Sequence, residues 1–167
     1  MVDSIAIIGD THALDFIQIP SKLIQIVQRS DWLIHTGDFI NLNVLEGFLK
    51  MKGSKFIGVC GNADTLDLMN RLNKIEIISI QGQKIGITHP FKGGPDHLTK
   101  NYVLNLFRNE KLDIIIYGHT HEIQVEKIGG IVLINPGKAY LNHSSAWLVL
   151  LNLDHELRIK IFEFKPS

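Results

Sequence analysis

Short apolar runs, each ending close to a glycine, are the feature of this sequence that most constrains its fold. Three of them stand in the first half of the chain, at residues 4–9, 32–35 and 55–60. Runs of this length without polar alternation are typical of strands buried on both faces. Helical spacing separates them, after Pro20 and again over residues 42–49. The resulting β-α-β-α-β order favours a parallel sheet flanked by helices, in which ligands gather at the carboxyl ends of the strands.

The second half of the chain changes toward antiparallel strands joined by tight turns. We predict a hairpin of residues 75–80 with 84–89, followed by a helix at residues 96–107. Five further strands are predicted at residues 114–117, 123–128, 131–134, 146–153 and 157–164. Within the helix, Leu98, Tyr102 and Leu106 can share a face. The pattern as a whole predicts an α/β protein with two mixed sheets. Because no low-complexity linker or internal repeat interrupts it, residues 1–167 are expected to form one domain.

Composition excludes several classes of partner. Lys and Arg number 17 and are balanced by 17 Asp and Glu, so no global field favours nucleic acid or an anionic membrane. The single Cys60 rules out an internal disulfide. No secretory leader pattern or membrane-spanning apolar run is visible, so a cytoplasmic protein is expected. An acidic ligand would therefore have to be bound by a local positive charge, such as that of a metal ion.

Residues able to bind a metal ion follow each of five predicted strands. They are Asp10 and His12, Asp38, Asn62, His89, and His119 with His121. Carboxylate, amide and imidazole groups together suit Mn, Fe, Ni or Zn, whereas Mg and Ca prefer oxygen ligands alone. One Gly-Asp is more typical of a turn, but the ordered set indicates a single cavity with enough ligands for two ions. His119 and His121 would point the same way along an extended chain.

These motifs together resemble the calcineurin-like metallophosphoesterase superfamily. The series that carries the resemblance is Asp10-x-His12, Gly37-Asp38, Gly61-Asn62-x-Asp64, His89 and Gly118-His119-x-His121. The chain length and Asn135-Pro136-Gly137 are similar to its small phosphodiesterase subfamily. The resemblance implies a four-layer αββα sandwich, the metallophosphoesterase fold.

The resemblance also implies how the ligands divide. It places Asp10, His12, Asp38 and His121 on one divalent ion, and Asp38, Asn62, His89 and His119 on the other. Asp38 would then bridge the two ions, of which manganese is the first expectation, with Ni, Zn, Fe or Mg as alternatives. A hydroxide between the ions would attack the phosphorus of a small phosphodiester, with Asp38, Asn62 and His119 as the catalytic residues.

Departures from the family pattern bear on the substrate. Many phosphomonoesterases of the superfamily carry a histidine after the motif asparagine, where this chain has Ala63. A general acid is therefore missing there, which favours diesters. Pro90 and Phe91 follow His89 and could alter the pocket, whose walls we expect from loops at residues 13–19, 64–74 and 90–97. Lys138 is interpreted as a solvated loop lysine, with a phosphate contact as the alternative.

Other notable side chains receive structural interpretations. Cys60, Trp32 and Trp147 are expected to pack in the core, and His35 to be a core or supporting residue rather than a ligand. The remaining histidines are predicted to lie at the surface: His97, His143 and His155. The alternative to an enzyme is a catalytically silent scaffold, because the fold also resembles the metallophosphoesterase-like subunit of the retromer coat. Apolar C-terminal strands could cover an interface of a homo-oligomer.

Overall fold

Two five-stranded sheets form the centre of the molecule in the computed structural model, which describes residues 3–90, 94–154 and 156–166. The first sheet has the order β10-β9-β1-β2-β3, with β1 (Asp3–Ile8), β2 (Trp32–His35), β3 (Phe56–Gly58), β9 (Ala146–Leu153) and β10 (Leu157–Phe164). The second has the order β4-β5-β6-β8-β7, with β4 (Ile75–Ile80), β5 (Gln83–Thr88), β6 (Ile114–Tyr117), β7 (Ile123–Ile128) and β8 (Ile131–Pro136). Each sheet combines parallel and antiparallel pairs.

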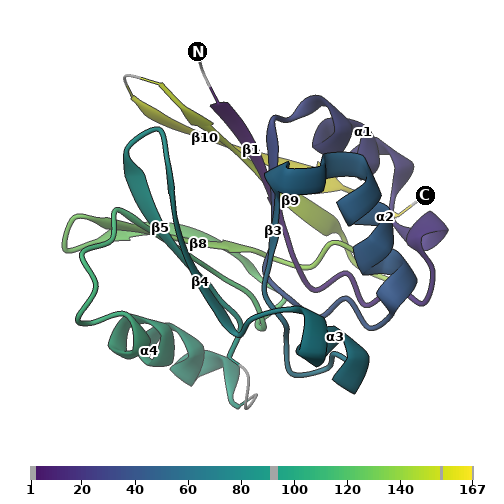
Figure 1. Cartoon of the computed structure of the whole chain (residues 1–167), viewed down its shortest axis with the longest axis horizontal. Helices are drawn as coiled ribbons and strands as arrows, with labels where there is room; N and C mark the ends of the chain where they lie inside the picture. Colours follow the sequence, from purple (N-terminus) through teal and green to yellow (C-terminus); the bar gives the residue numbers. More distant parts are fainter. Residues whose placement is uncertain (1–2, 91–93, 155, 167) are drawn as a thin grey trace.

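Helices cover the outer face of each sheet, so the layers follow the order αββα (Figure 1). The helices α1 (Ser21–Arg29) and α2 (Leu42–Lys52) pack on the first sheet, and α4 (Asp96–Leu106) packs on the second. The short α3 (Leu66–Arg71) and the 3-10 turns η1 (Phe16–Gln18) and η2 (Gly53–Lys55) complete the elements. The prediction of a four-layer sandwich with two mixed sheets is confirmed.

Strand alternation explains why three separate cores form. Along β1, Ile5 and Ile7 enter the core between the sheets, whereas Ala6 and Ile8 enter the core beneath α1 and α2. Successive side chains of a strand point to opposite faces, and both faces of β1 are covered. Figure 1 shows the two sheets facing one another with the carboxyl ends of β3 and β5 directed toward the same end of the molecule as α3. The apolar runs seen in the sequence therefore correspond to strands that are buried on both faces.

Four details differ from the sequence predictions. The strand expected at residues 55–60 is limited to β3, because η2 occupies its first residue and Val59 makes only an isolated bridge. The expected loop at 64–74 contains α3, and the loop at 13–19 contains η1. Leu98 and Tyr102 do share a face of α4, but this face is half exposed, and Thr99 and Val103 pack inward instead. None of the helices in the described ranges has the length and apolar character needed to cross a bilayer.

Phe48 of α2 gives a test of the core beneath the first sheet. Its buried ring meets Phe16 at 5.1 Å and Phe56 at 6.4 Å between centroids. Phe48→Ala is expected to lower the free energy of unfolding by about 3–5 kcal/mol through loss of burial and a residual cavity. Urea denaturation measures the change, with Ile17→Ala as the control because Ile17 is 87% exposed. Equal losses in the two variants would contradict this packing.

Candidate metal centre

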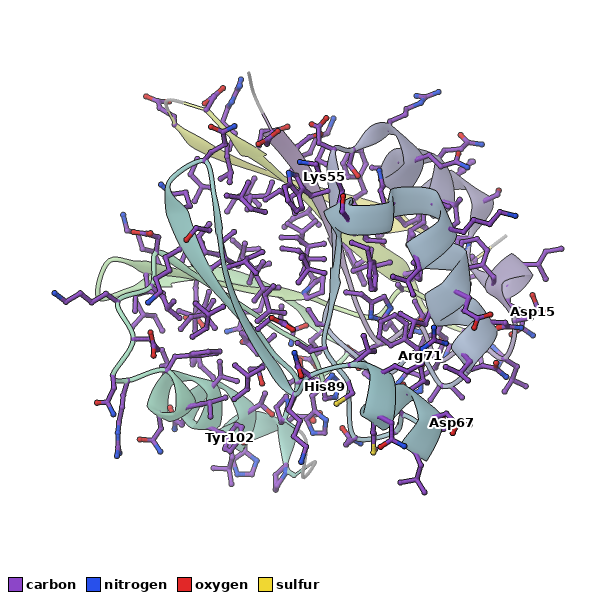
Figure 2. All side chains as sticks on the ribbon, viewed as in Figure 1. Asp15, Lys55, Asp67, Arg71, His89 and Tyr102 are labelled. Atoms are coloured by element: carbon purple, nitrogen blue, oxygen red, sulfur yellow. The ribbon has the colours of Figure 1, made fainter. Side chains whose placement is uncertain are left out.

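The seven predicted ligand residues meet at one edge of the molecule. Asp10, His12, Asp38 and Asn62 follow strands β1, β2 and β3 of the first sheet, and His89, His119 and His121 follow β5 and β6 of the second. Figure 2 shows His89 at the lower end of the view, between the ends of the two sheets. Because parallel strands direct their carboxyl ends to the same edge, residues spread over the chain become neighbours.

One group of ligand atoms surrounds Asp10. Its Oδ1 lies 3.4 Å from His121 Nε2 and 3.9 Å from His12 Nε2. These three residues can place one ligand atom each within 4.8 Å of one another. Asp10 Oδ1 and His12 Nε2 are buried and have no hydrogen-bond partner. Buried polar atoms without a partner are costly, and a divalent cation between them would satisfy both, so this donor set fits a metal ion.

Asp38 connects this group to a second one. Asp38 Oδ2 lies 3.4 Å from His12 Nε2 and 3.6 Å from His89 Nε2. On the far side, Asn62 Oδ1 lies 3.0 Å from His89 Nε2 and 2.9 Å from His119 Nδ1. Asp10, Asp38 and His89 can likewise place one ligand atom each within 4.8 Å of one another. A single carboxylate oxygen therefore faces both groups, as a bridging ligand must.

Backbone carbonyls orient two of the histidines. His89 Nδ1 donates to the carbonyl of Thr36 at 2.8 Å, and His119 Nε2 donates to the carbonyl of Gly94 at 2.9 Å. Each bond places the ring proton on the outer nitrogen and directs the lone pair of the other nitrogen into the centre. Metal-binding histidines in proteins are commonly fixed in this way. Thr36 and Gly94 could not be predicted from the sequence, because each acts through its backbone carbonyl.

Five of the candidate ligands have left-handed backbone conformations. Positive φ values occur at Asp10 (47°), His12 (42°), Asp38 (58°), His119 (98°) and His121 (59°). Such conformations cost a non-glycine residue about 1–3 kcal/mol and cluster at functional sites. The expectation that His119 and His121 lie on an extended chain is wrong. The bend between them instead turns one ring toward Asn62 and the other toward Asp10.

Glycines allow the strand ends to approach the ligands. A Cβ at Gly61 would lie 2.0 Å from Asp38 Oδ1, and one at Gly118 would lie 2.8 Å from His89 Nδ1. Any side chain at these positions would displace a candidate ligand. Gly61 and Gly118 are therefore required by the lack of space for a side chain, whereas neither has a positive φ.

Asp64 is a supporting residue whose role was not predicted from the sequence. Its Oδ2 accepts from the amides of Gly61 at 2.8 Å and Asp38 at 3.1 Å, and its Oδ1 accepts from Ile40 at 2.9 Å. Burial raises the pKa of this carboxyl, and the bonds from Gly61 and Ile40 offset part of the increase. Asp64 thus ties the loop after β2 to the loop after β3. The only available signal was its place in the motif, two residues after Asn62.

Protonation of the centre follows from burial and neighbouring charge. Burial opposes ionisation of Asp38, but the imidazole of His12, whose Nε2 lies 3.4 Å away, and the charge of His89 outweigh burial and hold the pKa of Asp38 below the usual value. The carboxylate of Asp10, whose Oδ1 lies 3.4 Å from His121 Nε2, raises the pKa of His121 against the effect of burial. A raised histidine pKa means that protons compete with a metal for this ligand up to a higher pH.

His35 and Lys138 have different outcomes. His35 is buried, stacks on Phe39 at 3.6 Å between centroids and contacts Thr11 Oγ1 at 3.2 Å, so the prediction of a core or supporting role is confirmed. The interpretation of Lys138 as a solvated lysine is wrong, because the residue is only 6% exposed. Its ammonium lies 4.1 Å from the centroid of the Tyr140 ring, which meets the rings of both His12 and His121. Lys138 therefore contacts a ring that packs against two of the candidate ligands.

The remaining predictions concern packing and surface positions. Cys60 is buried and its thiol pKa is raised, chiefly by burial, so it suits packing rather than catalysis. Trp32 and Trp147 are half-buried rather than fully in the core. His97 and His143 are exposed as predicted. His155 and Phe91 lie outside the described residues.

Comparison with known proteins agrees with this centre. The calcineurin-like phosphoesterase superfamily domain matches residues 4–156. The chain belongs to this family. A probable metallophosphoesterase of Methanocaldococcus jannaschii is 32% identical over 137 residues, which cover 80% of this chain and 66% of that protein. A phosphodiesterase of the same organism is 29% identical over 147 residues, covering 80% and 82% of the two chains. The structure of vacuolar protein sorting 29 from Cryptosporidium parvum shares the fold, with a TM-score of 0.74 at 18% identity over 99% of both chains.

Asp64 provides a test of loop support within this phosphoesterase domain. Asp64→Asn keeps the shape of the side chain but leaves one acceptor oxygen where two are needed. We expect the free energy of unfolding to fall by about 1–3 kcal/mol and metal affinity to fall about 10- to 100-fold. Titration calorimetry with Mn²⁺ and urea denaturation measure the two effects. Asp67→Asn, at an exposed position of α3, is the matched control, and metal binding unchanged in both variants would refute the support role.

Proposed function

We propose that residues 1–167 form a single-domain, dinuclear-metal-dependent phosphodiesterase. The observation that carries the proposal is the position of Asp38 Oδ2, within 3.6 Å of both His12 Nε2 and His89 Nε2. A carboxylate shared between two groups of ligand atoms is what a pair of close ions requires. Members of this family are generally hydrolases, and one relative is named a phosphodiesterase.

Each ion has a full set of ligands in this proposal. Asp10, His12, Asp38 and His121 hold the first, and Asp38, Asn62, His89 and His119 hold the second. Manganese is our first choice, because carboxylate, amide and imidazole suit it, and Ni, Zn, Fe and Mg are the alternatives. When bound, the pair supplies an acidified water for attack and stabilises charge on the phosphoryl oxygens. The carbonyls of Thr36 and Gly94 keep His89 and His119 in the orientation that this role needs.

Ala63 is the reason for preferring diesters. Its side chain is exposed beside the centre and cannot transfer a proton, while its amide donates to Asp38 Oδ1 at 2.8 Å. Without an acid at this position, a substrate must lose its leaving group with little help. Diesters with acidic leaving groups satisfy that condition. The amide of Ala63 instead helps to fix the bridging carboxylate.

A second function is favoured by one comparison. The similarity in fold to vacuolar protein sorting 29 supports a catalytically silent scaffold that works through protein contacts. We prefer the enzyme because all seven ligand positions are occupied by suitable residues, whose side chains form one continuous cluster.

Replacement of the bridging residue tests the mechanism. Asp38→Asn removes the negative charge that two cations would share, so it is expected to abolish the second binding site and to lower kcat for bis(p-nitrophenyl) phosphate about 100-fold or more. Hydrolysis is measured with Mn²⁺, Ni²⁺, Zn²⁺ and Mg²⁺, and bound metal is counted by calorimetry. The control Asp67→Asn should bind two ions and retain full activity. Equal rates for Asp38→Asn and the parent would reject the mechanism.

The diester preference has its own test. Ala63→His restores an imidazole where monoesterases of the superfamily carry one, so it is expected to raise kcat/KM for p-nitrophenyl phosphate relative to bis(p-nitrophenyl) phosphate by about tenfold or more. Ala63→Gln is the control for side-chain size. A rate ratio that does not move, in a variant that still binds two ions, would show that Ala63 does not set the preference.

A further inference from the structure

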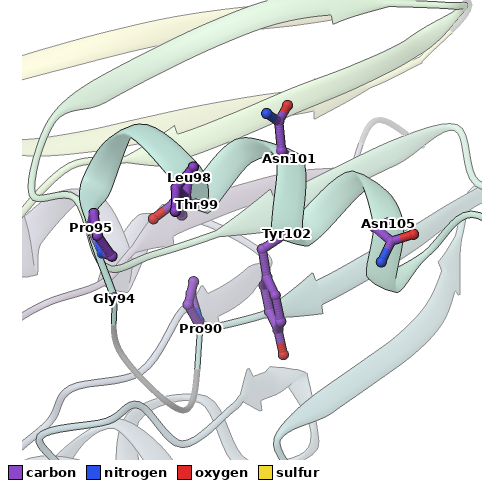
Figure 3. A pocket seen from close by; sticks show the side chains of 8 residues that line it. All are labelled: Pro90, Gly94, Pro95, Leu98, Thr99, Asn101, Tyr102 and Asn105. Atoms are coloured by element: carbon purple, nitrogen blue, oxygen red, sulfur yellow. The ribbon is translucent and has the colours of Figure 1, made fainter.

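A cavity of about 430 Å³ adjoins the candidate metal centre along α4. The residues that line it are Pro90, Gly94, Pro95, Leu98, Thr99, Asn101, Tyr102 and Asn105. Figure 3 shows Tyr102 extending from α4 beside Pro90, with Gly94 and Pro95 at the start of the helix. A cavity of this size can take a ligand of roughly drug or nucleoside size.

Two of its walls are continuous with the proposed second metal site. Pro90 directly follows His89 in the chain. Gly94 accepts a hydrogen bond from His119 Nε2 at 2.9 Å, and Asp96 Oδ1 lies 3.9 Å from the same nitrogen. A group that enters this cavity therefore lies next to the ligands of the second ion. The cavity therefore borders the candidate centre through Pro90 and Gly94.

The chemistry of the lining selects an uncharged, partly aromatic group. Leu98, Asn101, Tyr102 and Asn105 follow i, i+3, i+4, i+7 spacing and form one stripe of α4. Leu98 is 50% exposed and Tyr102 is 45% exposed, so the helix presents apolar surface here instead of burying it. The two amides can donate and accept hydrogen bonds. None of the described lining residues carries a formal charge, which disfavours a second phosphate group.

We propose that this cavity is the subsite for one organic arm of the diester, and that the arm is an uncharged aromatic group of nucleoside size. Its ring stacks on Tyr102, and its polar edge faces Asn101 and Asn105. The inference rests on the proposed function, because the scissile phosphate must lie at the metal centre for its arm to reach α4. It also accounts for the face of Leu98 and Tyr102 that the sequence predicted and the core does not use.

Two substrates with the same leaving group test the subsite. They are methyl p-nitrophenyl phosphate and the p-nitrophenyl ester of thymidine 5′-phosphate, so only the retained arm differs. We expect Tyr102→Ala to lower kcat/KM for the thymidine ester about tenfold, as loss of one stacked base does, and to leave the methyl ester within about twofold. Tyr102→Phe should restore the preference, because the ring is kept. His97→Ala, on an exposed part of α4 outside the lining, is the matched control.

Binding to the metal-free chain gives a second readout that does not depend on catalysis. Thymidine, followed by ¹H–¹⁵N NMR, should shift the amide signals of Leu98, Tyr102 and Asn105 in the parent and in His97→Ala. The shifts should be lost in Tyr102→Ala, whose circular dichroism spectrum should match that of the parent because Tyr102 is half exposed. Shifts elsewhere, or shifts retained in Tyr102→Ala, would overturn the subsite.

The possible failures are distinguishable. No hydrolysis of either ester by the parent with any of the four metal ions would overturn the proposed function, and the subsite with it. Hydrolysis of both esters with the same rate ratio in the parent and Tyr102→Ala would overturn the subsite alone. Changes in the α4 signals with protein concentration, in the absence of thymidine, would assign this face to a second copy of the chain and also overturn it.

Discussion

Two buried carboxylates, Asp10 and Asp38, are the constraint on which the rest of the structure depends. Charge in a protein interior is tolerated only where opposite charge or hydrogen bonds compensate it. Among the described residues, the ion pairs of these carboxylates are all with histidines, and no Lys or Arg reaches them. The glycines at the strand ends, the left-handed backbone and the amides of Ala63 and His119, which donate to Asp38 and Asp10 respectively, hold this pair in place.

Much of the fold could be predicted because a strand that is buried on both faces has a continuous apolar run in the sequence. The apolar runs around Ile7 and Ile115 marked β1 and β6, and the turn at Gly82 marked the hairpin of β4 and β5. The six-residue α3 was missed because it is too short for helical periodicity to be visible. The orientation of α4 was also beyond reach, since Thr99 packs inward while Tyr102 remains half exposed, against their usual preferences.

The candidate site was predictable in membership but not in shape. Side chains such as His89 and His119 belong to types that bind metals, and the topology of parallel strands brings their positions together. Their orientation depends on the backbone carbonyls of distant residues. Because every residue has such a carbonyl, the sequence does not indicate which one a histidine contacts. The burial of Lys138 was missed for a different reason, because it depends on contacts with the ring of Tyr140 and the side chain of Asn142 that the motif does not indicate.

The division of the ligands between the two sheets has a consequence for how the protein matures. Asp10, His12, Asp38 and Asn62 belong to the first sheet, whereas the other three ligands come from the second. A chain still being synthesised lacks part of the proposed coordination sphere until His121 has left the ribosome. Binding of the two metal ions would then be a late event in biogenesis. A chain that holds both ions would be one in which the two sheets have already docked.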